Sequence, residues 1–415
     1  MRIKIKKIDA TTFDDYARNH PLRSYYQTSS YGNLMSKHGY LPIYIAAYDS
    51  SQTIVGASLI LIKRLKGVKY GYAPRGFLID FFDKDFVKLF TKKVRKFFYR
   101  RMYSFIKVNP EVMLSLVDDK TNTKTVNKLS HKLMEDLVRL NYMPLKNNLY
   151  FESLIPKYNA VIHLPSYSQK VLNKKIIDTL NFTENSGMRV IKSVENNIDA
   201  FIELVGNKNK DVYTNYFNSF HANDMLDVWF VEVDFTKYIE TLQKAYTKEF
   251  KKNEKLNNEF YSEENNIELY NNKLESDQYL AHLNKEITIA SKNINVGNNI
   301  GYVAGMLCVR YGDRISILKS YFKQDHFEEE TNYFLYHNIL MEYKNAGFKY
   351  IDFNGISGDF SESNPYKESS EFILNFNPKV LEYIGEFDLI VHQTIYAILW
   401  STKAVHKEFE KDEKK

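Results

Sequence analysis

The sequence predicts two lobes of mixed α/β (α+β) structure, with a charged helical arm inserted into the second lobe. Three observations support this fold class. The chain has 415 residues, of which 44% are hydrophobic, and this is enough to build more than one core. Stretches with the period of a strand alternate with stretches of helical period. Finally, residues 236–293 contain no proline or glycine and carry only one apolar stripe.

Residues 1–155 are expected to form the first lobe. The expected elements, in chain order, are strands at 43–47, 54–61 and 69–72, a helix at 83–101, a strand at 104–108 and a helix at 125–140. The strand at 104–108 stops at Asn109-Pro110, and the last helix ends at Asn141. Because helices and strands alternate, this lobe is predicted to be α/β.

The helix at 83–101 is predicted to be amphipathic and basic. Phe86, Phe90, Val94 and Phe97 lie at helical spacing, and eight lysines and arginines mostly occupy the other faces. One interpretation is a helix docked by its aromatic stripe, with a solvated basic face. The other adds a contact between that face and nucleic acid or an anionic membrane surface.

Residues 156–400 are expected to form the second lobe, followed by a charged tail at 401–415. The expected elements are a strand at 160–164, helices at 168–180 and 198–205, a strand at 228–233, a hairpin of strands at 301–310 and 314–318, a helix at 328–345 and a strand at 348–353. Gly347 is the expected C-cap of the helix before the last of these strands.

The arm, residues 236–293, is rich in lysine, glutamate and asparagine. Its apolar residues recur at spacings of three and four, at Ile239, Leu242, Tyr246, Tyr270, Leu274, Leu280, Leu283 and Ile287. This pattern is typical of the seam of an antiparallel helical hairpin. Because the remaining faces offer nothing to bury, we expect the arm to project from the second lobe.

Composition indicates an intracellular protein without metal, cofactor or cysteine chemistry. Cys308, the single cysteine, excludes an internal disulfide and lies in an apolar run, where a small buried hydrophobe is expected. No cysteines and histidines have zinc-ligand spacing. The N-terminus lacks an apolar signal region, and the longest apolar stretch, 57–62, is too short to span a bilayer. A net charge of +6 favours anionic partners.

Two segments near the end of the chain carry a specific pattern. Residues 347–363 read GFKYIDFNGISGDFSES, and residues 376–391 read FNPKVLEYIGEFDLIV. The first resembles the strand and G-x-S-G-D-F-S-E turn of the FemABX family of aminoacyl-tRNA-dependent peptidyltransferases, which includes the MurM-like branch. The second resembles that family's F-N-P-x-[IV]-x-E-[FY]-x-G-[ED]-F close.

Weaker matches follow the family's order along the chain. They are Gln27-Thr28-Ser29 with Tyr31, similar to the family's Q-S-x-x-W, residues 72–76 with Asp80, similar to its P-R-G-P-x-x-D, and residues 158–162. The arm also lies where the family carries a coiled coil. The resemblance therefore covers the chain from about Tyr25 to Val391.

The resemblance implies two GNAT-like lobes and a defined reaction. An amine on the stem peptide of a lipid-linked peptidoglycan precursor attacks the ester of an aminoacyl-tRNA. Because the ester is already activated, such an enzyme mainly aligns two polyanionic substrates, and it needs no nucleophilic triad and no cofactor besides the aminoacyl-tRNA co-substrate. The implied place of work is the cytoplasm, at the inner membrane surface. Homo-oligomers, or hetero-oligomers with a related transferase, are a further expectation.

The resemblance assigns no catalytic residue and six candidate substrate-binding residues, namely Lys37, Arg75, Lys210, Tyr216, Asp359 and Phe372. Arg75 matches the family's Pro-Arg-Gly, where it would hold an anionic group or fix its loop by bonding carbonyls. Lys210 stands where the family has an arginine that grips substrate phosphates. A lysine there would bind as a point charge, and the alternative is an ordinary surface lysine.

The other four candidates rest on shorter matches. Tyr216 and Phe217 are similar to the family's pair of tyrosines, and Phe372 begins the segment similar to its F-K-x-x-F. Asp359 lies in the best-preserved motif, although the glycines beside it suggest that the backbone of the turn is what matters. Lys37 lies two residues beyond the position of the family's phosphate-binding lysine.

Three positions depart from the family's pattern. Met35 stands at the position of the phosphate-binding lysine, Asn109 at that of an aspartate near the reacting centre, and Ile373 at that of the lysine in F-K-x-x-F. Asparagine cannot accept a proton, and isoleucine cannot stabilise an oxyanion. The departures point to a changed acceptor, a reshaped site or lost activity.

Three hypotheses therefore stay open. The leading one is an aminoacyltransferase acting on the peptidoglycan precursor. The second is a catalytically weakened or inactive relative that acts as a binding partner or regulator. An acyl-CoA-dependent N-acyltransferase ranks last, because the sequence has no Q/R-x-x-G-x-G/A loop to hold a pyrophosphate.

Overall fold

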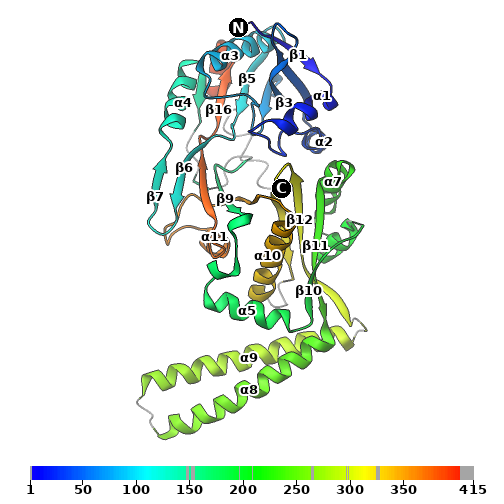
Figure 1. Cartoon of the computed structure of the whole chain (residues 1–415), viewed down its shortest axis with the longest axis vertical. Coiled ribbons are helices and arrows are strands. Elements are labelled where there is room, and N and C mark those ends of the chain that lie inside the picture. Colours follow the sequence, from blue (N-terminus) through cyan, green and yellow to red (C-terminus); the bar gives the residue numbers. More distant parts are fainter. Residues whose placement is uncertain are drawn as a thin grey trace.

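The computed structural model describes residues 2–145, 149–150, 155–195, 197–207, 209–262, 266–295, 297, 299–323 and 328–401. Figure 1 shows two lobes stacked along the long axis of the molecule, with a helical hairpin at the end of the second lobe. Of the expected tail at 401–415, Ser401 ends the last described helix, and residues 402–415 lie outside the described residues.

The first lobe is built on a seven-stranded sheet. Its strands, in spatial order, are β1 (Lys4–Ile8), β2 (Leu41–Tyr48), β3 (Ile54–Leu65), β4 (Val68–Ala73), β5 (Tyr103–Val108), β16 (Phe387–Ile390) and β8 (Tyr142–Pro144). Helices α3 (Lys84–Tyr99) and α4 (Lys128–Arg139) bury their apolar residues in one core cluster, and α1 (Ala10–Asn19) and α2 (Ser29–Lys37) in another. The α/β character predicted for this lobe is confirmed.

The second lobe is built on a nine-stranded sheet. Its strands, in spatial order, are β10 (Met188–Lys192), β11 (Leu226–Asp234), β12 (Ile300–Tyr311), β13 (Arg314–Phe322), β14 (Tyr350–Gly355), β9 (Tyr158–His163), β15 (Lys379–Tyr383), β6 (Met113–Asp118) and β7 (Thr123–Val126). Helices α5 (Lys174–Glu184) and α10 (Glu328–Asn345) share one core with this sheet. The remaining helices of the lobe are α6 (Ile198–Leu204), α7 (Lys210–Phe220) and α11 (Lys367–Leu374).

One hydrophobic core belongs to both lobes. It joins Phe13 and Leu59 of the first lobe to Phe201, Phe220 and Leu307 of the second, and all five side chains are buried. The lobes are therefore held together by apolar packing as well as by polar contacts.

The chain does not pass from the first sheet to the second at a single point. β6 and β7 precede residue 155 but join the second sheet, where Ser115 pairs with Glu382. β16 and α12 (Gln393–Ser401) follow residue 156 but pack on the first lobe, where Phe387 pairs with Val108. The expected boundary at 155/156 thus does not separate the sheets, because pairing in a sheet depends on side-chain faces and not on chain order.

Most of the expected elements are present, and the differences have local causes. The helix expected at 125–140 begins at Lys128, because Thr125 and Val126 pair with β6. Asn127 then caps the helix by accepting the backbone N–H of Leu129 and Ser130. The helix expected at 168–180 is α5, which begins at Lys174 behind the cap residue Asn173. Cys308 is fully buried in β12, as expected.

The basic helix α3 is docked by its aromatic stripe, as the first interpretation predicts. Phe86, Phe90 and Val94 are buried in the first lobe as predicted, but the fourth buried aromatic residue is Phe98, and the expected Phe97 is only partly buried. One of the cations on α3 is used inside the molecule, since Arg95 Nε donates to the carbonyl oxygen of Ile390 at 2.9 Å.

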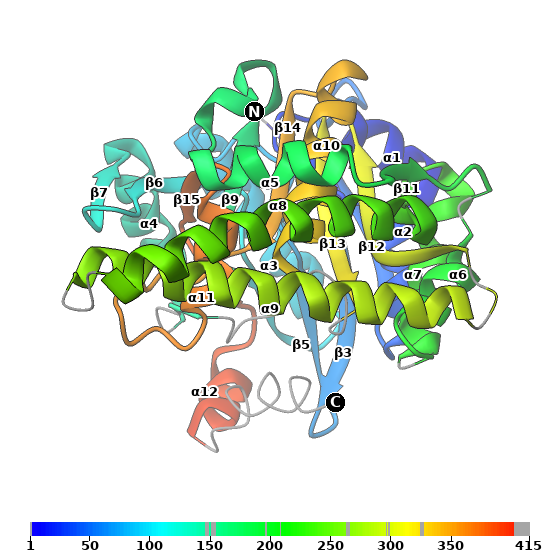
Figure 2. The same ribbon diagram turned by 90° about the horizontal axis from the view of Figure 1, so that it is seen from below.

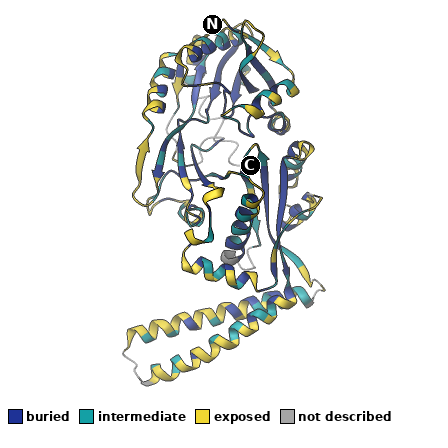
Figure 3. Cartoon of the chain, viewed as in Figure 1, coloured by how far each residue is buried: buried dark blue, intermediate teal, exposed yellow. Residues whose placement is uncertain are grey.

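The arm is a helical hairpin, as expected, of α8 (Phe235–Ser262) and α9 (Ile267–Asn295). Its base is part of the second lobe, because Tyr238, Leu242, Leu283 and Ala290 belong to that lobe's core. Farther out the two helices are mainly exposed (Figure 3). Figure 2 shows the hairpin lying across the end of the second lobe.

The outer part of the arm's seam contains polar pairs, which the apolar spacing did not predict. Asn253 Nδ2 donates to Asp277 Oδ1 at 2.7 Å, and Ser276 Oγ donates to Glu249 Oε1 at 2.7 Å. Tyr270 contacts Phe260 across the hairpin, with ring centroids 6.1 Å apart, whereas Leu274 is 42% exposed. Here the polar pairs between the helices fix the register, and this leaves Leu274 facing solvent.

Candidate functional site

The candidate site lies where the turn after β4 meets the second lobe. Arg75 in this turn adopts the left-handed region, with φ of 48°. Its backbone N–H donates to Asn109 Oδ1 at 2.8 Å, and the N–H of Gly76 donates to the carbonyl of Ala73 at 3.1 Å. These two bonds support a conformation that is unfavourable for a side chain with a Cβ atom.

The guanidinium of Arg75 is buried and contacts the second lobe. Its Nη2 donates to the carbonyl of Pro156 at 3.0 Å and to Asn159 Oδ1 at 3.1 Å. The guanidinium carbon also lies 4.1 Å from the ring centroid of Tyr383. Arg75 therefore bonds a backbone carbonyl and a side-chain amide of the second lobe, and it joins the two lobes. A role for Arg75 in holding an anionic group stays a prediction.

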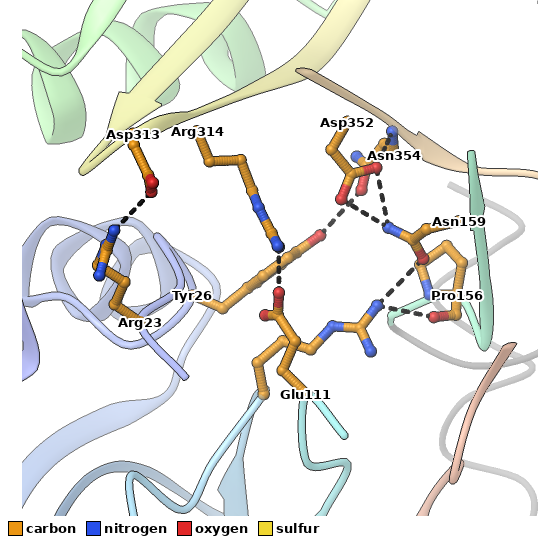
Figure 4. A network of polar contacts seen from close by, with 10 residues as sticks. Arg23, Tyr26, Glu111, Pro156, Asn159, Asp313, Arg314, Asp352 and Asn354 are labelled. Carbon is orange, nitrogen blue, oxygen red and sulfur yellow. Dashed lines mark hydrogen bonds and ion pairs between the residues drawn. The ribbon is translucent and has the colours of Figure 1, made fainter. Parts of the chain in front are cut away.

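Asn159 continues the network into the second sheet (Figure 4). Its Nδ2 donates to both carboxylate oxygens of Asp352, at 3.0 and 3.1 Å. Asp352 Oδ1 also accepts the backbone N–H of Asn354 at 2.8 Å, and Tyr26 in the first lobe donates its hydroxyl to Asn354 Oδ1 at 3.3 Å. Burial raises the pKa of Asp352 to about 6, although Arg314 acts in the opposite direction.

Two ion pairs flank this network and also bridge the lobes. Arg314 at the start of β13 pairs with Glu111, whose charge raises the pKa of the arginine. Arg23 pairs with Asp313 at 2.5 Å, at a more exposed position. Opposite charges from segments far apart in the sequence thus hold the facing surfaces in one arrangement.

Asn109 is fixed by its neighbours. Its Oδ1 accepts the N–H of Arg75, so its Nδ2 is the donor toward the hydroxyl of Tyr72, at 3.2 Å. Asn109 is 3% exposed. At this position the chain therefore has a structural amide that supports the Arg75 turn and cannot accept a proton.

Tyr216 lies on α7 and faces an aromatic cluster of the first lobe. Tyr25 and Tyr26 have ring centroids 4.1 Å apart, and Tyr26 and Tyr31 are 5.0 Å apart. Phe220 of α7 contacts Tyr25 at 6.0 Å and stacks with Tyr216 at 6.4 Å. Burial raises the pKa of Tyr26 to about 12, so this cluster is neutral and offers hydroxyl groups and ring faces.

Lys37 and Lys210 are exposed on neighbouring helices. Lys37 is the last residue of α2 and Lys210 the first of α7, and both helices contribute to the core shared by the lobes. Neither side chain makes a hydrogen bond or ion pair with a described residue. Both remain candidate cations at the interlobe surface.

Asp359 and Phe372 lie apart from the Arg75 network. Asp359 Oδ2 accepts the hydroxyl of Tyr150 at 2.8 Å, in a groove formed with the β6–β7 turn. Phe372 packs against Tyr333 and Phe376, with ring centroids 4.9 and 5.6 Å away. Ile373 packs on the same core. Among the residues that the structure describes, no hydrogen bond or ring contact joins Asp359 or Phe372 to the residues labelled in Figure 4.

The comparisons with known proteins point to one family over almost the whole chain. The model of the FemAB family matches residues 8–404. The chain belongs to the FemAB family. Aminoacyltransferase FemA of Staphylococcus epidermidis is 23% identical in an alignment 443 positions long, which covers 98% of this chain and all of FemA. Aminoacyltransferase FemB of the same species is 20% identical in an alignment 429 positions long, which covers 99% of this chain and all of FemB.

The crystal structure of FemX matches with a TM-score of 0.71 at 15% identity, over 95% of this chain and 99% of FemX. This similarity confirms the predicted fold class, two lobes of mixed α/β structure with a helical arm in the second. Membership of the FemAB family also confirms the predicted class of enzyme, because the FemA and FemB relatives are aminoacyltransferases.

Besides the predicted residues, this FemAB protein has a buried acid that the sequence analysis missed. Glu382 accepts hydrogen bonds from Lys157 at 2.8 Å, Ser115 at 2.6 Å and Tyr158 at 3.0 Å, and it pairs with Lys124 at 3.1 Å. Burial alone would raise the pKa of Glu382, but these hydrogen bonds and lysine charges lower it to about 2.

The remaining network residues, Glu111, Asn159, Arg314 and Asp352, were also missed. The sequence carries only a weak signal for these four residues. Asn159 and Asp352 are polar residues inside apolar strands, which points to a buried hydrogen-bond partner without naming it. Among the described residues, no helix is long and apolar enough to cross a membrane, and no group of three or more His, Cys, Asp or Glu is placed to hold a metal ion.

Proposed function

We propose that this FemAB protein transfers an amino acid from an aminoacyl-tRNA to an amine on the stem peptide of a lipid-linked peptidoglycan precursor. The observation that carries this proposal is the match to FemA and FemB over essentially their whole length, both lobes and arm included. The reaction includes no cofactor besides the aminoacyl-tRNA, because the ester supplies the activated carbonyl.

The surface chemistry supports two polyanionic substrates. On α8, Lys244, Lys248, Lys251 and Lys255 are exposed and lie at spacings of four, three and four, which places them on one face of the helix. Such a row of cations suits the phosphate backbone of the tRNA. At the interlobe surface, Lys37 and Lys210 are the candidate cations for the phosphates of the precursor.

The basic face of α3 supports work at the cytoplasmic surface of the membrane. Lys92 and Lys96 are exposed on this helix, and Lys93 is partly exposed. Cations near an anionic leaflet each contribute about 1 kcal/mol of attraction. Oligomerisation with a second copy, or with a related transferase, remains an expectation from the resemblance alone.

The test is a direct transfer assay. The purified chain is incubated with a charged tRNA pool and the lipid-linked precursor, and the precursor is weighed by mass spectrometry. We expect a mass gain of one amino-acid residue that depends on charged tRNA and does not occur with acyl-CoA. No gain, under conditions in which FemA modifies its own precursor, would overturn the proposal.

Two observations favour a second candidate function. Ile373 packs against the core of the second lobe, and Asn109 is held as a structural amide, so neither position supplies the charge that the resemblance implies. A catalytically weakened partner protein would fit this. In the same assay it would bind the precursor without changing its mass.

A further inference from the structure

The end of the first sheet at which β3 turns into β4 carries the last described helix, α12. β4 runs parallel to β5, with Lys69 opposite Tyr103, and β16 runs antiparallel to β5, with Ile390 opposite Phe105. The turn from β3 to β4, the start of β5 and the end of β16 therefore lie at the same end of the sheet. Figure 2 shows α12 (red) and the end of β3 (blue) on the same side of the molecule.

Helix α12 is docked by one face and leaves an apolar residue exposed on another. Its sequence, QTIYAILWS, contains no charged residue. Tyr396 and Leu399 are buried in a small core with Tyr70 of β4 and Phe105 of β5. Ile398 points away from this core and is 59% exposed. A helix without charge thus presents a large aliphatic side chain to solvent.

The C-terminal end of α3 lies beside the start of α12. Arg95 Nε donates to the carbonyl oxygen of Ile390 at 2.9 Å, and the ring of Tyr99 stacks on that of His392, with centroids 5.2 Å apart. Tyr99 is 53% exposed, and Met102, just before β5, is 62% exposed. The exposed apolar residues at this end of the sheet therefore come from two segments that contact each other.

Cations surround these apolar residues. Arg64 and Lys66 are exposed at the turn from β3 to β4, and Arg100 and Arg101 are exposed directly after α3. Burial raises the pKa of Tyr103, and the charges of Arg101 and Arg64 oppose this, so both arginines lie near the same ring. We define the α12 surface by seven exposed residues, namely Arg64, Lys66, Tyr99, Arg100, Arg101, Met102 and Ile398.

The segments that form the α12 surface contain no acidic residue. Residues 50–79, 86–110 and 389–401 lack aspartate and glutamate, and the first two segments hold five and eight lysines and arginines. Charge of a single sign attracts an anionic partner and repels a cationic one. Because these cations adjoin exposed apolar side chains, the surface fits a partner that offers both negative charge and an apolar interior.

An anionic bilayer has both properties, whereas a nucleic acid has only the first. Ile398 and Met102 gain nothing from a phosphate backbone, but they lose water when they enter the boundary between headgroups and acyl chains. Aromatic side chains favour the same boundary. Tyr99 is one such residue, and Trp400, half-buried near the end of α12, is another.

We propose that the α12 surface docks the protein on an anionic phospholipid bilayer, with Ile398 and Met102 inserted at the headgroup level and the cations bound to lipid phosphates. Lys92 and Lys96 precede Tyr99 on α3 by seven and three residues, so the basic face of this helix continues into the surface. The inference rests on the proposed function for its purpose, which is to reach the lipid-linked precursor, but the docking itself needs no precursor.

The first test measures binding of the full chain to vesicles without precursor, by cosedimentation at physiological salt. Wild type should bind vesicles of phosphatidylcholine with phosphatidylglycerol at least about tenfold more tightly than phosphatidylcholine alone. Ile398→Asp should lower the affinity for the anionic vesicles about tenfold. Ile300→Asp is the matched control, because Ile300 at the start of β12 is also 59% exposed, and it should leave the affinity unchanged.

The cations are tested by charge reversal. The affinity for anionic vesicles should fall at least about tenfold in a variant that combines Arg64→Glu, Lys66→Glu, Arg100→Glu and Arg101→Glu. A control with the same change in net charge alters four exposed lysines of the second lobe and should keep most of the affinity; it combines Lys170→Glu, Lys174→Glu, Lys175→Glu and Lys319→Glu. Circular dichroism reports whether each variant folds.

Trp400 gives a readout in the unaltered protein. The chain has two tryptophans, and the other, Trp229, is 5% exposed in the second lobe. Phospholipids brominated on their acyl chains quench only rings that reach the bilayer, so they should quench the Trp400 part of the fluorescence. Bound protein without any quenching would overturn the insertion of α12, even if a variant does not fold.

The outcomes separate this inference from the proposed function. Unchanged vesicle binding in both variants of the α12 surface would overturn the inference, whether they lower tRNA retention or dissociate a dimer instead. If wild type binds vesicles but transfers no amino acid, the proposed function fails and the docking surface stands. If wild type modifies the precursor in detergent but binds no vesicle, the inference fails and the proposed function stands.

Discussion

The polar network between the lobes, which includes Arg75, Asn159, Glu111 and Arg314, differs from the arm in how far apart its partners lie in the sequence. Between the lobes, Arg75 and Asn159 are 84 residues apart in sequence, and Glu111 and Arg314 are 203 residues apart. In the arm, Asn253 and Asp277 are separated by 24 residues and lie on adjacent helices. The network is a long-range assembly of buried groups, whereas the arm is a local structure with one short connection.

This difference gives the two regions separate tasks. Buried charges that satisfy one another fix a single geometry, which is what a reaction between two substrates needs. An exposed hairpin with a row of lysines offers charge without a unique geometry, which is enough to attract a nucleic acid.

Breaking the interlobe ion pair should have the largest effect. Arg314→Ala leaves the largely buried Glu111 without its partner, so we expect a loss of about 3–5 kcal/mol in the free energy of unfolding, measured in urea. Arg189→Ala breaks a surface pair in which the arginine is 69% exposed, and it should cost at most about 1 kcal/mol. Equal losses would mean that the network is no more than surface charge.

The pH dependence of stability should carry the signature of Glu382. Its pKa is lowered from 4.5 to about 2 in the folded state, so its contribution is fully present above about pH 4.5 and is lost as the pH falls toward 2. We expect wild type to exceed Glu382→Gln by roughly 3 kcal/mol at neutral pH, and this difference should shrink in acid. A difference that does not change with pH would show that the carboxylate charge is not what stabilises the fold.

Charge reversal on the arm should weaken RNA binding and leave the fold intact. Changing Lys244, Lys248 and Lys251 to glutamate removes three exposed cations from one face of α8. We expect affinity for tRNA to fall about tenfold or more, with a shallower salt dependence. The same test on Lys92, Lys93 and Lys96 reports on α3. If the retention of tRNA on a filter at low salt is unchanged for either set of variants, that helix is not part of the tRNA-binding surface.

Shortening the arm should have the smallest effect on stability. Replacing residues 249–276 with a short glycine-rich loop removes the polar outer seam and keeps Tyr238, Leu242, Leu283 and Ala290 in the core. The free energy of unfolding should change by less than about 1 kcal/mol, because the removed residues are mostly exposed. If the shortened protein unfolds cooperatively at a much lower temperature than wild type, the outer arm is part of the core.

The same contrast explains what the sequence could reveal. The arm was predicted from periodicity, because its main contacts are between neighbouring helices. The polar pairs of its seam were missed, since Leu274 fits the apolar spacing better than Asn253 and Ser276 do. The two lobes and most of their strands were predicted from the sequence. The sequence did not show that β6 and β7 join the second sheet and β16 the first, because pairing partners cannot be found from spacing alone.

The candidate site was only partly accessible from sequence. Arg75 and Asn109 were singled out through the family pattern, and the structure brings them into contact. Glu382 lies in the motif at 376–391, but its partners Lys157, Ser115 and Lys124 come from other segments of the chain. Which partners meet depends on three-dimensional placement and leaves no mark in the spacing of residues.

The most direct test of this division of tasks is the transfer rate at saturating aminoacyl-tRNA, with two variants compared. The arm-shortened protein should keep kcat within about threefold of wild type while its KM for tRNA rises, because the arm contributes binding only. Arg75→Lys, which disturbs the interlobe turn, should lower kcat even at saturation. A collapse of kcat in the arm-shortened protein, with KM unchanged, would contradict the account.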